Sequence, residues 1–266
     1  MPKTLQEIGF IRSEAAYRPE TPRQGVWSCR TAVLELVDDP RFGDALLELD
    51  TVDRLWLIWG FHLTENWKPL VRPPQGANHR KIGVFATRSP HRPNQLGLSA
   101  VKLVRVEGCK LHLAEVDLLD GTPVYDIKPY VAESDAFPDA KVGWRCQALP
   151  SRTLIVSAEA EAQLNAIDHW GGPNLREVVR VQLTTREIDP RFQRLTPGRI
   201  PDEWVFAFRT WRCRFLLDGE NIRLREIFSG YSAKQLQDPA DPYGDKALHR
   251  ALIASGTCKS NEDGVY

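Results

Sequence analysis

Residues 83–99, with the sequence GVFATRSPHRPNQLGLS, constrain the fold of this chain more than any other segment. Apolar residues lead into the segment and follow it, whereas its middle carries Pro90 and Pro93. Because each proline fixes φ and removes a backbone donor, this middle part is not helical. The pattern predicts a strand, an irregular loop rich in hydrogen-bond donors, and a second strand. Rigid loops of this kind are common ligand sites.

The positive charge of the chain is concentrated around this loop. Six basic residues and no acidic residue lie from Lys68 to Arg92, although the whole chain balances 35 basic against 35 acidic residues. A local basic patch suits a polyanion such as a nucleic-acid backbone. The alternative is a solvated loop whose charges pair with acids elsewhere in the chain.

Length and composition leave the class of protein open but exclude several kinds. The 266 residues suffice for one large domain or two modest ones. No apolar run approaches the roughly 20 residues that span a bilayer, and the N-terminus lacks a signal-peptide core. The five scattered cysteines form no C-x-x-C pair, and the six histidines show no metal-ligand spacing. We therefore expect a reduced, cytoplasmic protein without a metal or a membrane anchor.

The sequence pattern of the first half of the chain predicts β-strands. Several short apolar or alternating runs are bounded by turn residues such as Asp120-Gly121. Such strands indicate an antiparallel sheet or barrel. Neither G-x-G-x-x-G nor a P-loop is present, so nothing indicates a Rossmann cofactor site. The expected strands are 8–11, 53–63, 98–106, 111–118 and 123–127.

The pattern changes after the irregular segment 132–153. Ser157 is expected to cap a helix that ends near Trp170, and Asn174 to cap a second helix. Apolar and basic residues then alternate in a hairpin that turns at Asp218-Gly219, which completes an α+β module. Its arginine rows suit either an RNA-facing surface or a plain solvent face. We expect domains at 1–150 and 151–230, followed by a polar tail at 231–266 that frays.

Two long motifs, residues 83–99 and the sequence DLLDGTPVYDIKPY at 117–130, resemble the TsaA-like, or TrmO-type, tRNA adenine N6-methyltransferases. Shorter pieces follow the family in order, so that the resemblance covers about residues 8–227. Two features depart from the family, which usually has proline at the position of Gln95 and a different segment after Arg191. The shorter pieces are 8–13, 22–25, 55–59, 61–64, 71–74 and 189–191.

The resemblance implies a mainly β protein, in which a TsaA-like antiparallel β-barrel methyltransferase domain precedes a smaller α+β C-terminal domain. It implies S-adenosylmethionine as the cofactor, bound at or near the interface of a homodimer. It also implies methyl transfer to N6 of threonylcarbamoyl-adenosine at position 37, in the anticodon loop of tRNA. The alternative is a noncatalytic RNA-binding barrel that has lost the cofactor.

Individual residues receive roles from the same resemblance. Without it, Leu118 and Leu119 would be assigned to the core, and Asp120 to an ordinary turn. The expected cofactor residues are Gln24, Gly25, Val26, His62, Leu63, Arg88, Leu98, Asp117, Leu118, Leu119 and Asp120. The expected catalytic residues are Asp126, Lys128 and Tyr130, where the Asp126 carboxylate and nearby backbone carbonyls would hold the amine hydrogens. The expected RNA or substrate contacts are Arg72, Lys81, Arg92, Asn94 and Lys128.

Overall fold

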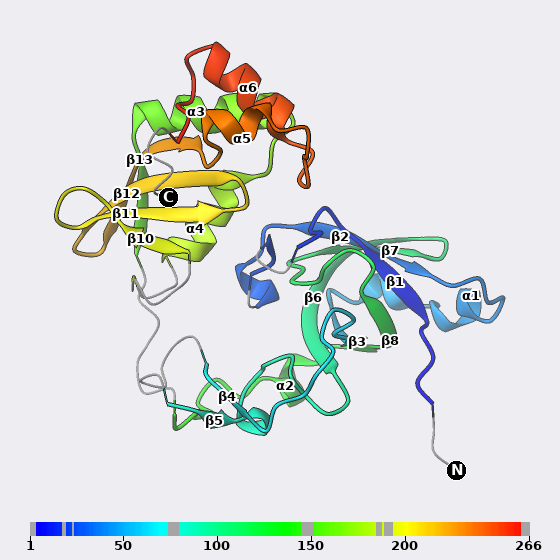
Figure 1. Ribbon diagram of the computed structural model, residues 1–266. Coiled ribbons are helices and arrows are strands. Elements are labelled where there is room, and N and C mark those ends of the chain that lie inside the picture. The colour runs from blue at the N-terminus through cyan, green and yellow to red at the C-terminus, as the bar shows by residue number, and fades with distance from the viewer. Residues whose placement is uncertain are drawn as a thin grey trace. The chain divides into compact units, whose positions relative to one another are not determined.

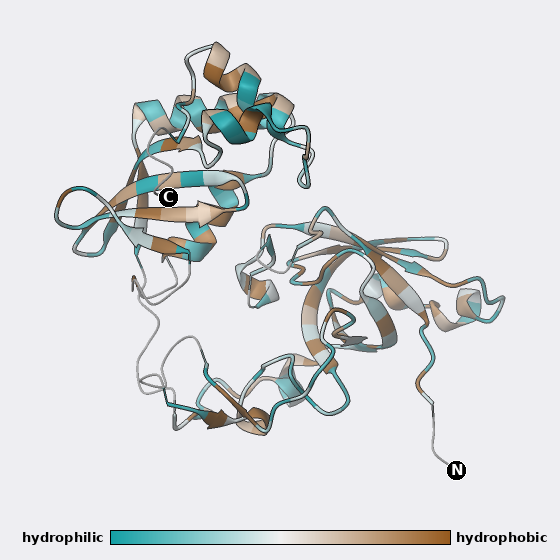
Figure 2. Ribbon diagram, in the orientation of Figure 1, coloured by the Kyte–Doolittle hydropathy of each residue, from teal (hydrophilic) through white to brown (hydrophobic). Residues whose placement is uncertain are grey.

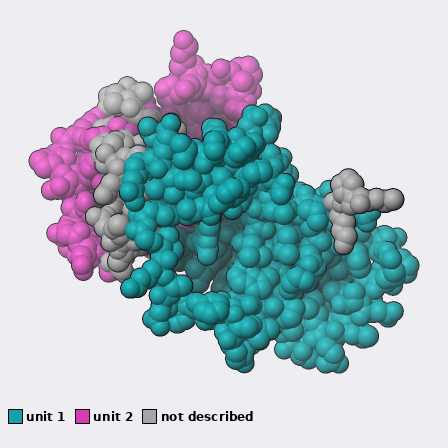
Figure 3. Space-filling model, turned by 90° about the horizontal axis from the view of Figure 1, so that it is seen from below, with its two compact units in different colours: residues 1–148 teal, residues 149–266 magenta. Residues whose placement is uncertain are grey.

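The computed structural model describes residues 4–17, 20–22, 24–73, 80–144, 152–184, 188 and 194–261. The chain divides into two compact units, unit 1 with residues 1–148 and unit 2 with residues 149–266 (Figure 3). The boundary expected at residue 150 stays a prediction, because residues 145–151 lie outside the described part of the chain. Each unit has an apolar core of its own, as expected of a domain.

Unit 1 is built around a closed barrel of antiparallel strands (Figure 1). The order around the barrel is β1 (Gly9–Arg12), β2 (Thr31–Leu36), β7 (Lys110–Ala114), β6 (Leu96–Glu107), β3 (Arg54–Gly60) and β8 (Pro123–Pro129). β8 pairs with β1, with Gly9 opposite Val124, and this pairing closes the barrel. The predicted antiparallel β-barrel is confirmed. Strand β2 is absent from the sequence-based expectation.

Alternation along the strands fills the barrel with apolar side chains. In β3, Leu55 and Leu57 are fully buried, whereas Trp56 between them is partly exposed. Their neighbour Val101 of β6 and Leu111 of β7 complete the same core. Figure 2 shows hydrophobic and hydrophilic residues alternating along these strands. Because successive side chains of a strand point to opposite faces, each strand has one core face and one outer face.

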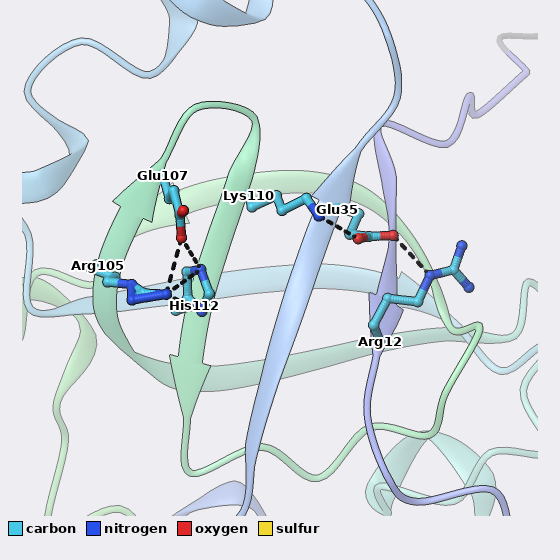
Figure 4. Close-up of polar contacts among 6 residues, drawn as sticks. All are labelled: Arg12, Glu35, Arg105, Glu107, Lys110 and His112. Atoms are coloured by element: carbon cyan, nitrogen blue, oxygen red, sulfur yellow. Dashed lines mark hydrogen bonds and ion pairs between the residues drawn. The ribbon is translucent and has the colours of Figure 1, made fainter.

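The outer face of strands β1, β2, β6 and β7 carries two small ionic clusters (Figure 4). In the first, Glu35 lies between Arg12 and Lys110, at 3.0 and 3.1 Å. The hydrogen bond from Arg12, followed by that from Lys110, lowers the pKa of the Glu35 carboxyl group. In the second cluster, Glu107 contacts Arg105 and His112 at 3.0 and 2.9 Å. Each cluster thus places one glutamate between two basic side chains, so these basic side chains are paired within the outer wall.

Short elements connect the barrel strands or follow the last of them. They are η2 (Gly25–Trp27), α1 (Phe42–Ala45), η3 (Leu49–Thr51), β4 (Leu70–Val71), β5 (Ile82–Gly83), η4 (Val84–Ala86) and α2 (Ala132–Asp135). Strands β4 and β5 form a two-stranded ribbon, with Leu70 opposite Gly83, inside the basic segment. The second predicted strand is confirmed as β6, which follows the proline-rich loop. The first is wrong in position, because Val84 and Phe85 lie in η4, directly after the two-residue strand β5.

Unit 2 is a five-stranded sheet with helices, as the predicted α+β module requires. The strand order is β10 (Leu195–Pro197), β11 (Glu203–Phe208), β12 (Trp211–Asp218), β13 (Asn221–Ser229) and β9 (Thr153–Val156), the last parallel to β13. Its helices are α3 (Ala158–His169), α4 (Leu175–Thr184), α5 (Ala233–Gln237) and α6 (Lys246–Ala254). Ser157 caps α3 by accepting the Ala160 amide at 3.1 Å, and Asn174 accepts the Glu177 amide at 3.0 Å. Both predicted caps are confirmed.

The end of the chain differs from the expected fraying tail. Leu252 of α6 and Cys258 are buried in the core of unit 2, and Ser232 begins α5 with a capping box. The sequence after residue 231 is polar on average, but its few apolar residues recur on one face of α6 and reach the core. Residues 262–266 lie outside the described part of the chain.

The arginine rows of the β12–β13 hairpin contact the protein itself. Arg214 bonds Glu226 at 2.5 Å, Arg223 bonds Asp218 at 2.9 Å, and Arg212 donates to backbone carbonyls. Three of the four arginines of these rows therefore bond within unit 2. Over the described segments, no helix has both the length and the apolar character needed to cross a membrane.

Candidate active site

A cavity of about 190 Å³ lies at the rim of the barrel where β3 ends. In an antiparallel barrel the end of one strand meets the start of its neighbour, so the segments after β3 and β7 and before β8 gather at one rim. Pro90 of the proline-rich loop completes the wall. The lining residues are Thr21, Trp59, Phe61, His62, Leu63, Thr64, Pro90, Asp117, Leu118, Leu119 and Thr122.

The cavity brings together five of the predicted cofactor residues. His62 and Leu63 lie in the turn after β3, where the His62 amide donates to the Gly60 carbonyl at 2.9 Å. Asp117, Leu118 and Leu119 come from the segment after β7, more than fifty residues further along the chain. Leu118 is both core and lining, because it is buried in the barrel cluster and borders the cavity.

Asp117 is the acidic residue of the cavity wall. Its Oδ1 accepts a hydrogen bond from the Ser99 hydroxyl at 2.7 Å, and Ser99 in turn accepts one from the Trp59 indole at 3.0 Å. Burial raises the pKa of the Asp117 carboxyl group, whereas the bonds from Ser99 and the Gly25 amide and the charge of Arg88 oppose that shift. An acceptor group surrounded by donors and apolar walls suits a ligand that donates hydrogen bonds or carries positive charge.

The loop before β2 carries predicted residues to the same place. Gly25 is buried, and a Cβ atom there would lie 2.3 Å from the Glu115 carbonyl oxygen, so only glycine allows this approach. Gln24 accepts a short hydrogen bond from Arg88. Gln24, Gly25 and Arg88 therefore gather around Asp117, beside the residues that line the cavity.

Two other predicted cofactor residues are strongly exposed. Val26 is 67% exposed and Leu98 is 59% exposed. Leu98 points to the outer face of β6 and therefore does not belong to the barrel core. The alternative assignment of Leu98 as a core residue is thus wrong.

Asp120 has a structural task in addition to its predicted role. Its Oδ1 accepts the Ser13 amide at 3.0 Å, and its own amide donates to the Ala15 carbonyl at 2.8 Å. Gly121 follows with φ of 72°, a value that favours glycine. The Asp120-Gly121 turn thus fastens the segment after β1 to the rim of the barrel.

The predicted substrate contact Arg92 holds the loop in place. Its guanidinium donates to the carbonyls of Thr87 and Val84, at 2.8 and 3.2 Å, and lies 5.8 Å from the Phe85 ring centre. Asn94 is exposed next to it. Gln95 adopts φ of 53°, which proline cannot adopt, so the backbone conformation at this position requires a residue other than proline.

The predicted RNA contacts Arg72 and Lys81 are both exposed at the ends of the β4–β5 ribbon. Pro74, which belongs to one of the family-like pieces, lies outside the described residues. The same holds for Asp189, Pro190 and Arg191.

The three predicted catalytic residues lie on the outer wall of the barrel and do not line the cavity. Lys128 contacts Asp126 at 3.2 Å, and Tyr130 lies 5.4 Å from the Trp56 ring. Trp56 also donates to Asp135 at 2.8 Å, which fixes the indole against the segment after β8.

Strand register connects this wall with the cofactor side. Leu98 of β6 is opposite Ile58 of β3, and Ile58 is opposite Asp126 of β8. Residues directly opposite each other point to the same face, and each strand step is about 4.8 Å. Leu98 and Asp126 therefore stand in one row, about 10 Å apart, on the outer face.

Sequence reasoning missed Trp59 and Ser99, which hold Asp117. Each follows the inward alternation of its strand, and Ser99 is the polar exception between apolar inward positions. A serine at an inward strand position could have identified this contact from the sequence, since a buried hydroxyl requires a hydrogen-bond partner.

Comparison with known proteins places this barrel in a family. Residues 10–136 match the family model described as the tRNA-methyltransferase O N-terminal domain. A putative S-adenosylmethionine-dependent methyltransferase of Pseudomonas aeruginosa is 38% identical over 205 residues, which cover 75% of this chain and 87% of that protein. The fold and the rim site thus define a β-barrel class of methyltransferase-like proteins, and the chain belongs to the tRNA-methyltransferase O (TrmO) family.

Two further proteins, whose names state the reaction or the family, are similar to this chain over most of its length. The tRNA (adenine(37)-N6)-methyltransferase of Escherichia coli is 38% identical over 245 residues, which cover 88% of this chain and 97% of the relative. The crystal structure of TrmO from Pseudomonas aeruginosa superimposes with a TM-score of 0.61 at 30% identity, over 85% of this chain and 98% of that one.

Proposed function

We propose that this protein is an S-adenosylmethionine-dependent tRNA methyltransferase that acts on N6 of threonylcarbamoyl-adenosine at position 37. Family membership over most of the chain supports the reaction, and the cavity at the barrel rim supports the place of the cofactor. The observation that carries the proposal is the convergence of five predicted cofactor residues on that cavity.

The residues of the cavity fit the cofactor. The apolar Leu118 and Leu119 offer a wall for a nucleoside base, and Asp117 offers an acceptor for hydroxyl groups. A cavity of about 190 Å³ is smaller than the roughly 300–1,000 Å³ of pockets that enclose a whole ligand. It therefore receives part of the cofactor, and the exposed Val26 and Leu98 contact the rest. When bound, S-adenosylmethionine supplies an electrophilic methyl group on a sulfonium centre.

The outer wall of the barrel holds the target base. The Asp126 carboxylate accepts hydrogens of the adenine amine, whose lone pair is delocalised into the ring and needs to be aimed. Lys128 pairs with the carboxylate of the threonylcarbamoyl group, and Tyr130 with Trp56 forms an aromatic side of the site. Position 37 lies in a loop, so its base is unstacked at lower cost than a base in a duplex.

The basic segment from Lys68 to Arg92 contacts the tRNA backbone. Arg72, Arg80 and Lys81 are exposed, so their charges are accessible to phosphates. RNA affinity should therefore fall as salt concentration rises.

A second copy of the chain covers the exposed apolar residues beside the cavity. Val26, Leu63 and Leu98 are 67%, 45% and 59% exposed, as apolar side chains of an interaction surface are. A homodimer accounts for them, and the expected setting of such a tRNA-modifying enzyme is the cytoplasm. Light scattering on the purified protein tests the dimer, because a monomer at micromolar concentration contradicts it.

Calorimetric titration with S-adenosylmethionine tests the cofactor assignment. We expect binding by the wild-type protein and a loss of roughly 10- to 150-fold in Arg88→Ala, the range for a charge-assisted hydrogen bond. Arg105→Ala is the matched control, since Arg105 is an exposed arginine that pairs with Glu107 near the end of β6, whereas the cavity lies where β6 begins (Figure 4). Absence of binding by the wild-type protein favours the noncatalytic RNA-binding barrel.

Methyl transfer to paired tRNAs tests the substrate. We expect transfer of labelled methyl to tRNA that carries threonylcarbamoyl-adenosine and little transfer to the unmodified transcript. Lys128→Ala should lower the rate on the modified tRNA most, because it removes the partner of the carboxylate. Equal rates on both tRNAs contradict recognition of the carboxylate but not methyl transfer.

A further inference from the structure

Ser99 is a polar residue on the inward face of β6. Its side chain is 5% exposed, and Val101, the next inward residue, is fully buried. A buried hydroxyl without a partner costs free energy, so its hydrogen bonds define its role. Both partners of Ser99 are known, namely Trp59 of β3 and Asp117 at the cavity.

The chemistry of the three side chains fixes the direction of both hydrogen bonds. The Trp59 indole nitrogen only donates, so the Ser99 oxygen accepts at 3.0 Å. The single hydroxyl hydrogen of Ser99 then goes to Asp117 Oδ1 at 2.7 Å. Asp117 is thereby an acceptor at this oxygen, and the Gly25 amide is a further donor to it.

Gly97 makes this arrangement possible. A Cβ atom at residue 97 would lie 2.4 Å from Cε2 of Trp59, so the indole ring occupies the space that any other residue would fill. Gly97 is directly opposite Trp59 in the sheet. The Gly97-Leu-Ser99 part of the long motif therefore seats the indole ring and receives its N–H group.

We propose that Ser99, oriented by Trp59, is a positioning residue that holds Asp117 as an acceptor for the ribose hydroxyl groups of the cofactor. This inference rests on the proposed function and adds two residues, of which Trp59 lines the cavity and Ser99 acts through Asp117. An acceptor fixed in this way favours a ligand with hydroxyl donors and disfavours an anionic one at the same position.

Calorimetric titration of the full chain with S-adenosylmethionine tests the proposal. Ser99→Ala should weaken binding roughly 10-fold, and Ser134→Ala, an exposed serine of unit 1, should leave it unchanged. In an Asp117→Asn background the further effect of Ser99→Ala should be much smaller, because Ser99 acts through the carboxylate. Trp59→Phe should weaken binding less than Ser99→Ala, since the hydroxyl still reaches Asp117.

The pH profile separates positioning from a general loss of structure. Ser99 lowers the pKa of Asp117, so its removal should move the acid limb of cofactor binding to higher pH. Arg88 and His62 also face the cavity region. Their contribution to the pH dependence of cofactor binding is measured in the Asp117→Asn variant, which lacks the Asp117 carboxyl group.

Three results overturn the proposal: wild-type affinity in Ser99→Ala, an equal effect of Ser99→Ala in the Asp117→Asn background, or an acid limb that does not move. If Ser99→Ala does not fold, the effect of Trp59→Phe on cofactor affinity is compared between the wild-type protein and the Asp117→Asn variant instead. Failure of the wild-type protein to bind the cofactor contradicts the proposed function instead, and is recognised separately.

Discussion

Gly97→Ala is expected to damage both the barrel and its cavity. The new methyl group would lie 2.4, 2.5 and 2.7 Å from three ring atoms of Trp59. The indole is held by Ser99 and packs against Phe61 with ring centres 4.3 Å apart, so it cannot move without breaking contacts. Overpacking of a core costs about 1–3 kcal/mol, and the lost hydrogen bond costs about 1 kcal/mol. Together they predict a loss of about 2–4 kcal/mol.

Thermal unfolding with cofactor titration measures both effects. A loss of this size lowers the melting temperature of a unit with about 150 residues by roughly 5–15 °C. Gly83→Ala is the matched control, because a Cβ atom at Gly83 meets nothing within 4 Å and should change stability by less than about 0.5 kcal/mol. Equal melting temperatures and affinities for Gly97→Ala and Gly83→Ala would refute the reasoning.

Three further predictions concern separate parts of the molecule. Gln95→Gly should raise stability in denaturant titration by roughly 0.5–1 kcal/mol, because φ of 53° strains any residue with a Cβ atom; a loss contradicts this conformation. Burial raises the pKa of Asp117 above its ordinary 3.8, so the native state binds the proton more tightly and stability falls as pH rises from about that value. Asp117→Asn should remove that part of the fall, and identical pH profiles of the melting temperature would contradict it. Thr210→Val should destabilise unit 2 by about 1–3 kcal/mol without changing cofactor affinity, because its hydroxyl bonds Asp245 at 2.5 Å and His249 at 3.0 Å.

Local chemistry made several features predictable from the sequence. Ser157 and Asn174 cap their helices with their own side chains, and Asp218-Gly219 turns a hairpin between strands that are neighbours in the chain. The prolines of the long loop exclude a helix whatever surrounds them. Each of these outcomes depends on residues within a few positions of one another, so no knowledge of the fold was needed.

Other features depended on contacts that sequence patterns do not encode. The polar end of the chain forms α6 because Leu252 finds the core of unit 2, which the average composition of the segment hides. Arg92 looked like a free cation for a substrate, yet it donates to the carbonyls of Thr87 and Val84. Composition shows that a charge exists, whereas only the tertiary structure shows what satisfies it.

The sequence by itself determined the class of protein, because two long motifs resemble the barrel family and the strand pattern agrees with a barrel. The tertiary structure decided which motif residues line the cavity and which lie on the outer wall of the barrel. Asp117 and Leu118 meet His62 at the cavity, whereas Asp126 and Lys128 lie on the outer wall. Alternation of side chains assigns residues to two faces, but strand register and barrel closure decide which residues from distant strands become neighbours.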